Sequence, residues 1–337
     1  MSLEQFTRAM LTAVEELLRR HVDAVQGAAL AELHHMLAYQ MGWEGEGAGP
    51  QARGKRLRPL LVLLTASAAG GEWRNALPAA AAVELLHNFS LVHDDIQDQS
   101  TLRRGRPAVW KLWGVAQAIN VGDALFTLAN QALLELEKTS TVEAALRASY
   151  IFQETCLALT QGQFLDLQYE ERQELSVEDY WPMVSGKTAA LLAACAQLGA
   201  VSVQAGEAAY EAYSRFGRDL GLAFQAQDDL LGIWGDAALT GKSAESDLVS
   251  GKKSLPVLYG LQQGGAFAER WKQGGVRPEE VPGLARQLEL EGARTFTQAQ
   301  VKRLTERAQQ ALREASPQGT AEEALRELAE MLVGRTS

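Results

Sequence analysis

The residues with the clearest chemical potential are three carboxylates in the stretch 91–98, which reads LVHDDIQD. Asp94, Asp95 and Asp98 occupy positions i, i+1 and i+4, so Asp94 and Asp98 lie on one face of a helix. Residues 79–92 are apolar enough to form a buried helix, and three like charges at its end are unfavourable unless something neutralises them. Mg²⁺ is the natural candidate, because it prefers oxygen ligands and also binds substrate phosphates. For this motif alone, a solvated acidic helix end remains an equal alternative.

A second acidic pair repeats the design, because Asp228 and Asp229 follow an apolar helical run within 224–232 (FQAQDDLLG). Two such helices with their acidic ends together would form a cleft with a carboxylate wall on each side. Metal ions between these walls could bridge a diphosphate. The two clusters together favour a metal site over a solvated helix end.

Basic residues are concentrated in two segments, although the net charge of the chain is −10. Residues 53–58 contain four cations in six positions and precede an apolar run, and Pro59 suits the first turn of that helix. Basic side chains at a helix N-terminus favour an anion site. In the second segment, Arg103 and Arg104 follow the first acidic motif and carry the planar donors that suit phosphate oxygens.

Two further segments could contribute to the same cavity. The tripeptide Gly186-Lys187-Thr188 suggests a P-loop, but residue 181 is tryptophan where that motif requires glycine, and no strand is expected before it. We therefore predict one lysine and one threonine facing the cavity, with Asp166 at its border. The glycine- and charge-rich residues 235–254 are predicted to form a loop or lid that excludes water from bound phosphates.

The elements that must position these residues are helices. The chain has 337 residues and 47% hydrophobic content, with almost no β-branched alternation, so we predict an all-α protein with a single domain over residues 1–337. The acidic net charge argues against nucleic acid as a partner. Cys156 and Cys195 fit core residues of a cytosolic protein. With no membrane span or signal peptide recognised, we expect a soluble cytoplasmic protein.

Between residues 55 and 256 the chain resembles the trans-isoprenyl diphosphate synthases, and more narrowly the bacterial short-chain members that make geranylgeranyl diphosphate. The motifs that carry the resemblance stand in family order: GKRLRP (54–59), ELLHNFSLVHDDIQD (84–98), LRRGRP (102–107), GKTA (186–189), FQAQDDLLGIWGD (224–236) and GKSAESDLVSGKKSLP (241–256). The resemblance implies the isoprenoid synthase helical bundle around a central cavity, usually as a homodimer. It also implies condensation of isopentenyl diphosphate with an allylic diphosphate (dimethylallyl, geranyl or farnesyl) to an all-trans product.

The resemblance also implies roles for individual residues, with several Mg²⁺ ions in each site. The matched metal ligands are Asp94, Asp95 and Asp98 in the first aspartate motif, and Asp228 and Asp229 in the second. The residues matched to isopentenyl diphosphate are Lys55, Arg58, His87 and Arg104. Those matched to the allylic diphosphate are Arg103, Lys187, Lys252 and, in the lid, Lys242. Thr188 and Gln225 match polar groups near the developing carbocation.

Three positions depart from the family pattern. Gly232 replaces the third aspartate of the second motif, Arg53 replaces the first glycine of a usual Gly-Gly-Lys, and Glu245 stands where glycine is common in the lid. We expect activity to survive the change at Gly232, although its effect on metal binding is open from the sequence.

The chemistry expected of such a site is ionisation followed by alkylation. Metal ions and cationic side chains withdraw charge from the allylic diphosphate, so that its C1–O bond breaks in a pocket free of water. The double bond of isopentenyl diphosphate attacks C1 and a proton is lost. No His or Glu is obviously placed as the base, and the resemblance implies that the released diphosphate takes the proton. A terpene cyclase is one alternative, against which Lys55, Arg58 and Arg104 argue. A non-catalytic subunit is another, but such subunits lose aspartates and five of six remain here.

Product length is expected to depend on the residues four and five before Asp94, which are Ser90 and Phe89. At a rise of about 1.5 Å per residue they lie roughly 6–7.5 Å deeper along the helix. Ser90 is small and leaves room, whereas Phe89 on the flank can form a partial floor or be ordinary core. The resemblance implies that one aromatic residue at the fifth position before the first aspartate, without an insertion in the motif, tends to give a product of twenty carbons. We therefore predict geranylgeranyl diphosphate as the main product, with farnesyl diphosphate as the runner-up and a longer-chain product as a further alternative.

Overall fold

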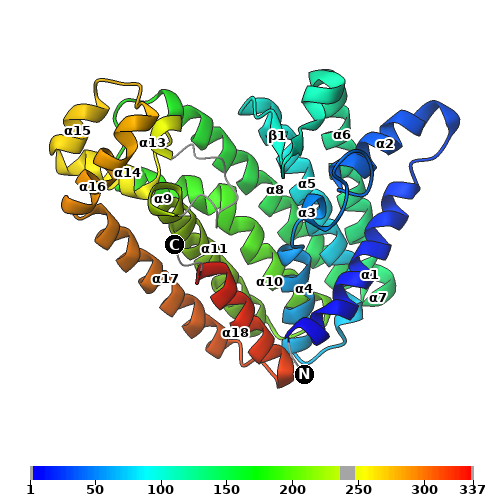
Figure 1. The fold of residues 1–337 in the computed structure, drawn as a ribbon. Helices are drawn as coiled ribbons and strands as arrows, with labels where there is room; N and C mark the ends of the chain where they lie inside the picture. The colour runs from blue at the N-terminus through cyan, green and yellow to red at the C-terminus, as the bar shows by residue number, and fades with distance from the viewer. Residues whose placement is uncertain (1–2, 236–246, 335–337) are drawn as a thin grey trace. The chain divides into compact units, whose positions relative to one another are not determined.

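A computed structural model describes residues 3–235 and 247–334, so Lys242 and Glu245 of the predicted lid lie outside the described residues. Contacts divide the chain into two compact units, each of which draws on three segments (Figure 1). Unit 1 comprises Met1–Gln153, Cys195–Glu211 and Ala315–Leu325, and unit 2 comprises Glu154–Ala194, Ala212–Glu314 and Arg326–Ser337. The prediction of a single domain stays a prediction.

Unit 1 is built from helices and a two-stranded hairpin. Its helices are α1 (Leu3–Asp23), α2 (Ala31–Gln40), α3 (Pro50–Arg53), α4 (Leu57–Ala68), α5 (Leu77–Gln97), α6 (Val109–Leu134) and α7 (Leu136–Thr139), with 3₁₀ turns at Ala28–Leu30 and Trp73–Ala76. The antiparallel strands are β1 (Leu102–Arg103) and β2 (Arg106–Pro107), paired as Leu102 with Pro107 and Arg103 with Arg106.

Among its described residues, unit 2 consists of helices and the loops that join them. Its own elements are α9 (Val177–Val184), a π-helical turn (Ser185–Ala189), α13 (Asp247–Ser250), α14 (Leu255–Gln263), α15 (Ala266–Trp271), a 3₁₀ turn (Pro278–Glu280), α16 (Val281–Leu290) and α17 (Ala293–Glu314). Four helices contribute residues to both units: α8 (Val142–Glu171), α10 (Ala190–Ser202), α11 (Glu207–Trp234) and α18 (Gly319–Val333). The all-α prediction is confirmed.

Helix α5 is the central helix of unit 1 and packs against α1, α4 and α6. Its first half is buried, because a run of alanines at 79–82 lets neighbouring helices approach closely. Pro78 lies in the first turn, where its missing N–H has no intrahelical partner to lose. The helix ends where the N–H of Asp98 donates to the carbonyl of Asp94 at 2.8 Å. The prediction of a buried helix that runs into the first aspartates is thus confirmed.

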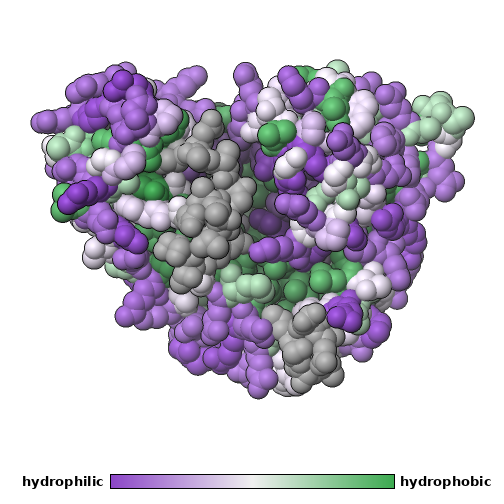
Figure 2. Space-filling model, in the orientation of Figure 1, coloured by the Kyte–Doolittle hydropathy of each residue, from purple (hydrophilic) through white to green (hydrophobic). Residues whose placement is uncertain are grey.

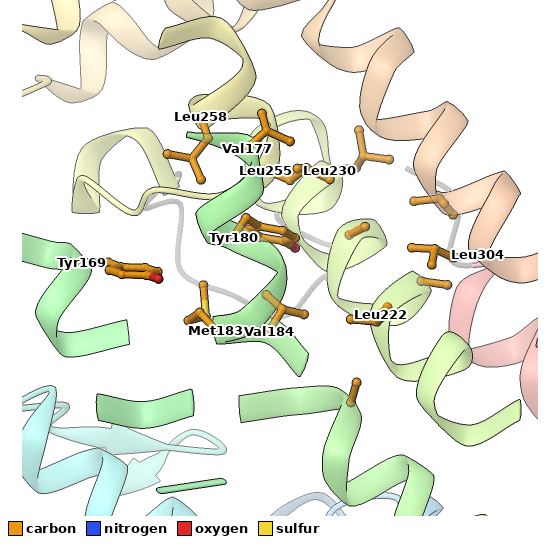
Figure 3. Close-up of a cluster of buried hydrophobic side chains, with 14 residues drawn as sticks. Tyr169, Val177, Tyr180, Met183, Val184, Leu222, Leu230, Leu255, Leu258 and Leu304 are labelled. Atoms are coloured by element: carbon orange, nitrogen blue, oxygen red, sulfur yellow. The ribbon is translucent and has the colours of Figure 1, made fainter. Parts of the chain in front are cut away.

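One apolar cluster in the core of unit 2 is made mainly by side chains from α9, α11, α14 and α17 (Figure 3). Tyr180, which is almost fully buried, lies among the labelled side chains of this cluster, with Leu222 and Leu230 from α11 nearby. Leu255 and Leu258 close the cluster from α14. This packing holds α11, which carries Gln225, Asp228 and Asp229, and α9, which leads into the π-helical turn with Lys187 and Thr188.

The surface is mostly hydrophilic on the face seen in Figure 2, with apolar side chains interspersed. Among the described residues, one helical stretch, Val177–Ser202, is long and apolar enough to cross a membrane by length and composition. Two thirds of its most apolar window is buried inside the protein (67%), as in the core helix of a water-soluble fold.

Candidate functional site

The first aspartate motif lies at the C-terminal end of α5, where its three carboxylates have different surroundings. Asp95 is buried, with 1% of its surface exposed, whereas Asp94 is half-buried and Asp98 is exposed. The guanidinium of Arg103 binds both oxygens of Asp95, with Nε at 3.0 and 3.2 Å and Nη2 on the same carboxylate. Burial raises the pKa of Asp95, while the hydrogen bonds from Arg103 oppose that rise. Asp95 is therefore held from the hairpin, and Asp94 and Asp98 share the exposed helix face.

The β1–β2 hairpin directs three arginines to three different places. Its turn is tight, with positive φ at Arg104 (52°) and Gly105 (75°). Arg103 reaches the aspartate motif, as described above, while Arg104 Nη1 donates to the carbonyls of Ala52 and Arg53 at 2.9 Å each. Arg106 holds the loop after α2 by donating to carbonyls of residues 39, 44 and 46. The hairpin thus ties the aspartate motif to the end of α3, which leads into α4.

The loop before α4 and the neighbouring part of α5 form a cationic region. Lys55 is exposed, and Arg58 in the first turn of α4 lies with Nη1 3.2 Å from His87 Nε2. Burial, followed by the charges of Arg58 and Arg104, holds the pKa of His87 well below its usual value. His87 is therefore neutral near pH 7, and its Nε2 accepts the hydrogen bond from Arg58. Of the predicted isopentenyl diphosphate residues, the structure thus brings Arg58 into contact with His87 and places the charge of Arg104 near them.

The candidate residues of unit 2 form a continuous hydrogen-bonded chain. Thr188 Oγ1 bonds Gln225 Oε1 at 2.9 Å, and Gln225 Nε2 donates to Asp229 Oδ1 at 3.1 Å. Lys187, beside Thr188, forms an ion pair with Asp166. Asp166, which the sequence places at the border of the cavity, is thus the ion-pair partner of Lys187.

A π-helical turn presents Lys187 and Thr188. Inserting one extra residue into a helix redirects the side chains of that turn, and such turns recur at functional sites. Helix α8 approaches the turn through two glycines: a Cβ on Gly186 would lie 2.6 Å from the carbonyl oxygen of Ala158 and 2.8 Å from the Cα of Gly162. No larger residue fits without displacing backbone.

The second aspartate motif contains one anchored carboxylate. Asp229 is fully buried and accepts hydrogen bonds from the Tyr180 hydroxyl (2.8 Å), the Leu255 N–H (3.0 Å) and Lys252 Nζ (3.1 Å). Burial and the adjacent Asp229 charge raise the pKa of Tyr180, which therefore stays a donor. Burial lowers the pKa of Lys252, but the charges of Asp229 and Asp247 raise it by more. The net pKa is therefore raised, and the lysine stays charged. Asp228, the neighbour of Asp229, is half-buried.

Gly232, the departure from the second motif, lies against the carboxylate of Asp247. A Cβ at residue 232 would lie 2.6 Å from Asp247 Cγ, so a side chain cannot be added there without displacing Asp247. The carboxylate of Asp247 also lies 3.6 Å from Lys252 Nζ. Sequence reasoning gave Asp247 no role, although it stands within the 241–256 segment that carried part of the resemblance. The acidic group that the motif lacks at position 232 is thus present nearby from α13.

The predicted chain-length residues lie on α5 next to different neighbours. The ring of Phe89 lies 4.7 Å from that of His93 and 5.1 Å from that of Phe126 in α6. Ser90 donates its hydroxyl to the carbonyl of His87 at 3.0 Å and adds no bulk.

Within the described parts of the chain, no three His, Cys, Asp or Glu side chains converge as they would around a metal ion. The carboxylate of Asp95 accepts hydrogen bonds from Arg103, and that of Asp229 accepts hydrogen bonds from Tyr180 and Lys252. The prediction that all five aspartates are metal ligands stays a prediction.

Comparisons with known proteins identify the family of the chain. The profile of the polyprenyl synthetase family matches residues 49–280. The (2E,6E)-farnesyl diphosphate synthase of Mycobacterium tuberculosis is 40% identical over 311 residues, which cover 89% of this chain and 85% of that protein. The geranylgeranyl diphosphate synthase of the same organism is 46% identical over 228 residues (67% and 64%). A polyprenyl synthetase structure from Streptomyces coelicolor A3(2) superposes with a TM-score of 0.86 at 40% identity, covering 96% and 97% of the two chains.

An all-α isoprenoid synthase fold with two aspartate-ended helices and nearby arginines and lysines defines a prenyltransferase. The chain belongs to the polyprenyl synthetase family. Its activity is that of a prenyl diphosphate synthase.

Proposed function

We propose that this chain condenses isopentenyl diphosphate with an allylic diphosphate, head to tail and with Mg²⁺, and that its main product is geranylgeranyl diphosphate. The observation that carries the proposal is the divergence of two consecutive arginines. Arg103 binds the first aspartate motif, whereas Arg104 binds two carbonyls at the end of α3, just before Lys55. In this proposal the hairpin serves two diphosphate substrates, which a condensation requires. A terpene cyclase would bind only one diphosphate substrate.

The donor set fits a hard divalent cation. Asp94 and Asp98 in the first motif and Asp228 in the second are carboxylates that are exposed or half-buried, and Mg²⁺ prefers oxygen ligands and keeps several waters. Asp95 and Asp229 are tied to Arg103 and Lys252, so in this proposal they orient their helix ends as well as add charge. When bound, Mg²⁺ would act as a Lewis acid that stabilises the departing diphosphate.

The remaining steps are assigned to side chains of this chain. Arg103, Lys187 and Lys252 bind the allylic diphosphate and stabilise the charge that it gains when its C1–O bond breaks. The oxygens of Thr188 and Gln225 face the resulting cation. Lys55, Arg58, His87 and Arg104 hold isopentenyl diphosphate while its double bond forms the new bond to C1. The proton then lost passes to the released diphosphate, and Lys242 belongs to the proposed lid.

The twenty-carbon product is supported by Phe89, which the aromatic contacts with His93 and Phe126 hold in place, and by the small Ser90. The two named relatives from Mycobacterium tuberculosis, a farnesyl and a geranylgeranyl diphosphate synthase, show that identity of this order accompanies both product lengths. Farnesyl diphosphate is therefore the alternative product.

We further propose a homodimer in the cytoplasm. In α8, Val142, Leu146 and Tyr150 follow one another at i, i+4 and i+8 and are 74%, 58% and 68% exposed. In α6, Val115 and Ile119 are exposed at the same spacing. Apolar stripes of this kind on helices favour burial against another surface, for which a second copy is the proposed occupant. Light scattering at micromolar concentration tests this, and a monomeric mass would contradict it.

The decisive experiment follows labelled isopentenyl diphosphate. The purified chain is incubated with Mg²⁺ and, in turn, with dimethylallyl, geranyl and farnesyl diphosphate, and the products are dephosphorylated and separated by chromatography. We expect label in geranylgeraniol from all three primers. Label that stops at fifteen carbons would replace the product assignment by farnesyl diphosphate. A hydrocarbon formed without isopentenyl diphosphate would indicate a cyclase, and no consumption by the chain alone would indicate a non-catalytic subunit.

A further inference from the structure

Arg56 is the one basic residue of the GKRLRP segment that is buried, with 6% of its surface exposed, and the proposed function gives it no role. It caps the N-terminus of α4 in the left-handed conformation (φ 49°, ψ 38°). A residue with a β-carbon adopts this conformation only when its surroundings hold it there. The contacts of its side chain identify what holds it.

All three nitrogens of the Arg56 guanidinium are engaged, each with a different part of unit 1. Nε donates to Glu15 of α1 at 2.7 Å, and Nη1 donates to Glu84 of α5 at 2.6 Å. Nη2 donates to the carbonyl of Met41, which follows α2, at 3.1 Å. Burial disfavours the charge of Arg56, but the carboxylates of Glu84 and Glu15 outweigh it and raise the pKa of Arg56. Asn88 donates to the same oxygen of Glu84 at 3.0 Å, so that this buried carboxylate is well satisfied.

The Arg56–Glu84 and Arg58–His87 pairs both link the start of α4 to α5. Arg58 stands two residues beyond Arg56, and His87 stands three residues beyond Glu84, so the two links lie side by side between the same helices. The first link is buried and charged, whereas the second joins two residues assigned to isopentenyl diphosphate. Lys55, exposed, directly precedes Arg56.

We propose that Arg56 is a positioning residue whose ion pair with Glu84 fixes residues 54–58, so that Lys55 and Arg58 are presented to the diphosphate of isopentenyl diphosphate. The proposal rests on the proposed function, because it concerns the substrate of that function. Arg56 itself does not touch substrate. Three of the five N–H donors of its guanidinium bind protein oxygens, and the side chain is only 4% exposed, so little of it is accessible to a phosphate.

Removing Arg56 alone leaves Glu84 buried without its cation, which destabilises a fold strongly. The test therefore uses the double variant Arg56→Met/Glu84→Gln, which removes both charges and keeps an oxygen that accepts from Asn88. Glu15 retains the Trp43 indole N–H, 2.8 Å away, and is partly exposed. This variant separates a folding role from a positioning role, because stability is retained while the anchor of the loop is lost.

We expect the double variant to unfold within a few degrees of the wild type and to raise the KM for isopentenyl diphosphate about tenfold or more, since misplacement of a binding group by about 1 Å is costly. The KM for the allylic diphosphate should stay within about twofold. Arg56→Lys keeps the charge but loses the three-nitrogen fork. Its KM for isopentenyl diphosphate should lie between those of the double variant and the wild type.

A matched control removes another arginine–glutamate pair whose arginine also donates to backbone carbonyls. Arg270 pairs with Glu280 at 2.8 Å through each of two nitrogens and donates to the carbonyls of Gly274 and Gly275. Arg270→Met/Glu280→Gln should leave both Michaelis constants unchanged. A folded Arg56→Met/Glu84→Gln protein with a wild-type KM for isopentenyl diphosphate, or with both constants raised equally, would overturn the proposal. Failure of the wild type to consume isopentenyl diphosphate would instead overturn the proposed function.

Discussion

Phe89 in α5 and Phe126 in α6 have their ring centroids 5.1 Å apart, and the ring centroid of His93 lies 4.7 Å from that of Phe89. His93 is accommodated because residue 122 of α6 is glycine: a Cβ there would overlap the imidazole. The aromatic side chain proposed to limit product length is therefore fixed by packing between two helices, and its position depends on α6 as well as on α5.

Phe89→Ala should lengthen the product, because it removes the ring that narrows the path beside the first aspartate motif. We expect twenty-five-carbon and longer products to replace a substantial share of the geranylgeranyl diphosphate. Ser90→Phe should shorten the main product to fifteen carbons. Chromatography of dephosphorylated products measures both. Phe296→Ala, which disrupts the stacked Tyr259–Phe296 pair (4.4 Å) in unit 2, is the matched control and should leave the distribution unchanged. An unchanged distribution in Phe89→Ala would place the floor elsewhere.

The two residues of the second aspartate pair should respond differently to substitution. Asp228→Ala, like Asp94→Ala, should lower kcat by roughly 10²-fold or more, because charge stabilisation of the departing diphosphate is lost. Their stability should change little, since like-charge repulsion is relieved. Asp229→Ala should in addition cost about 2 kcal/mol or more of unfolding free energy, because the Tyr180 hydroxyl and the Leu255 N–H lose their buried acceptor.

Steady-state turnover and urea unfolding of these variants distinguish the two effects. Near-wild-type turnover in Asp94→Ala or Asp228→Ala would refute the metal-site assignment. Wild-type stability in Asp229→Ala would show that the hydrogen bonds to Tyr180 and Leu255 contribute nothing.

Lys55→Ala and Arg58→Ala should weaken isopentenyl diphosphate and spare the allylic substrate. Each removes a charge-assisted contact worth roughly 1.5–3 kcal/mol, which corresponds to a ten- to hundredfold rise in the Michaelis constant. Initial rates with one substrate varied and the other saturating give both constants. An effect confined to the allylic diphosphate would reverse the assignment of the two diphosphate sites.

Gly232→Asp should not improve the enzyme, although it restores the aspartate that the motif usually has. The new side chain would overlap the carboxylate of Asp247 and place a like charge against it. We expect a loss of about 1–3 kcal/mol in stability, as in other overpacked sites, together with lower turnover. Gly232→Asp/Asp247→Gly should recover part of the stability. If the single variant is as stable and active as the wild type, Asp247 does not occupy this space in solution.

Acid should destabilise the protein through His87. The pKa of His87 is lowered in the folded state, mainly by burial and then by Arg58, so below about pH 6.5 the unfolded chain binds a proton that the folded chain does not. The unfolding free energy therefore falls as the pH drops below 6.5, and His87→Gln should flatten this dependence. His21 also has a lowered pKa, mainly from burial, so His21→Gln measures its separate share. An identical pH profile in wild type and His87→Gln would contradict the assignment.

The sequence by itself determined the helices and the chemistry that they carry. Helical periodicity and the alanine run place a buried helix before Asp94, and a second apolar run ends in Asp228 and Asp229; both signals are local in the chain, so they survive without knowledge of the fold. The motif spacings likewise sufficed to predict the family. These features depend on residues within one or two helical turns of each other.

Only the tertiary structure decided which side chains are partners. Asp95 was predicted as a metal ligand equivalent to Asp94, but the turn of the hairpin brings Arg103 onto it. Asp229 meets Tyr180, 49 residues away, and Gly232 makes room for Asp247 from another helix. Hydrogen bonds and steric fit depend on where separate backbones place their side chains in space. No periodicity within a single segment contains that information, and so the sequence predicted the charged groups but not which of them anchor the others.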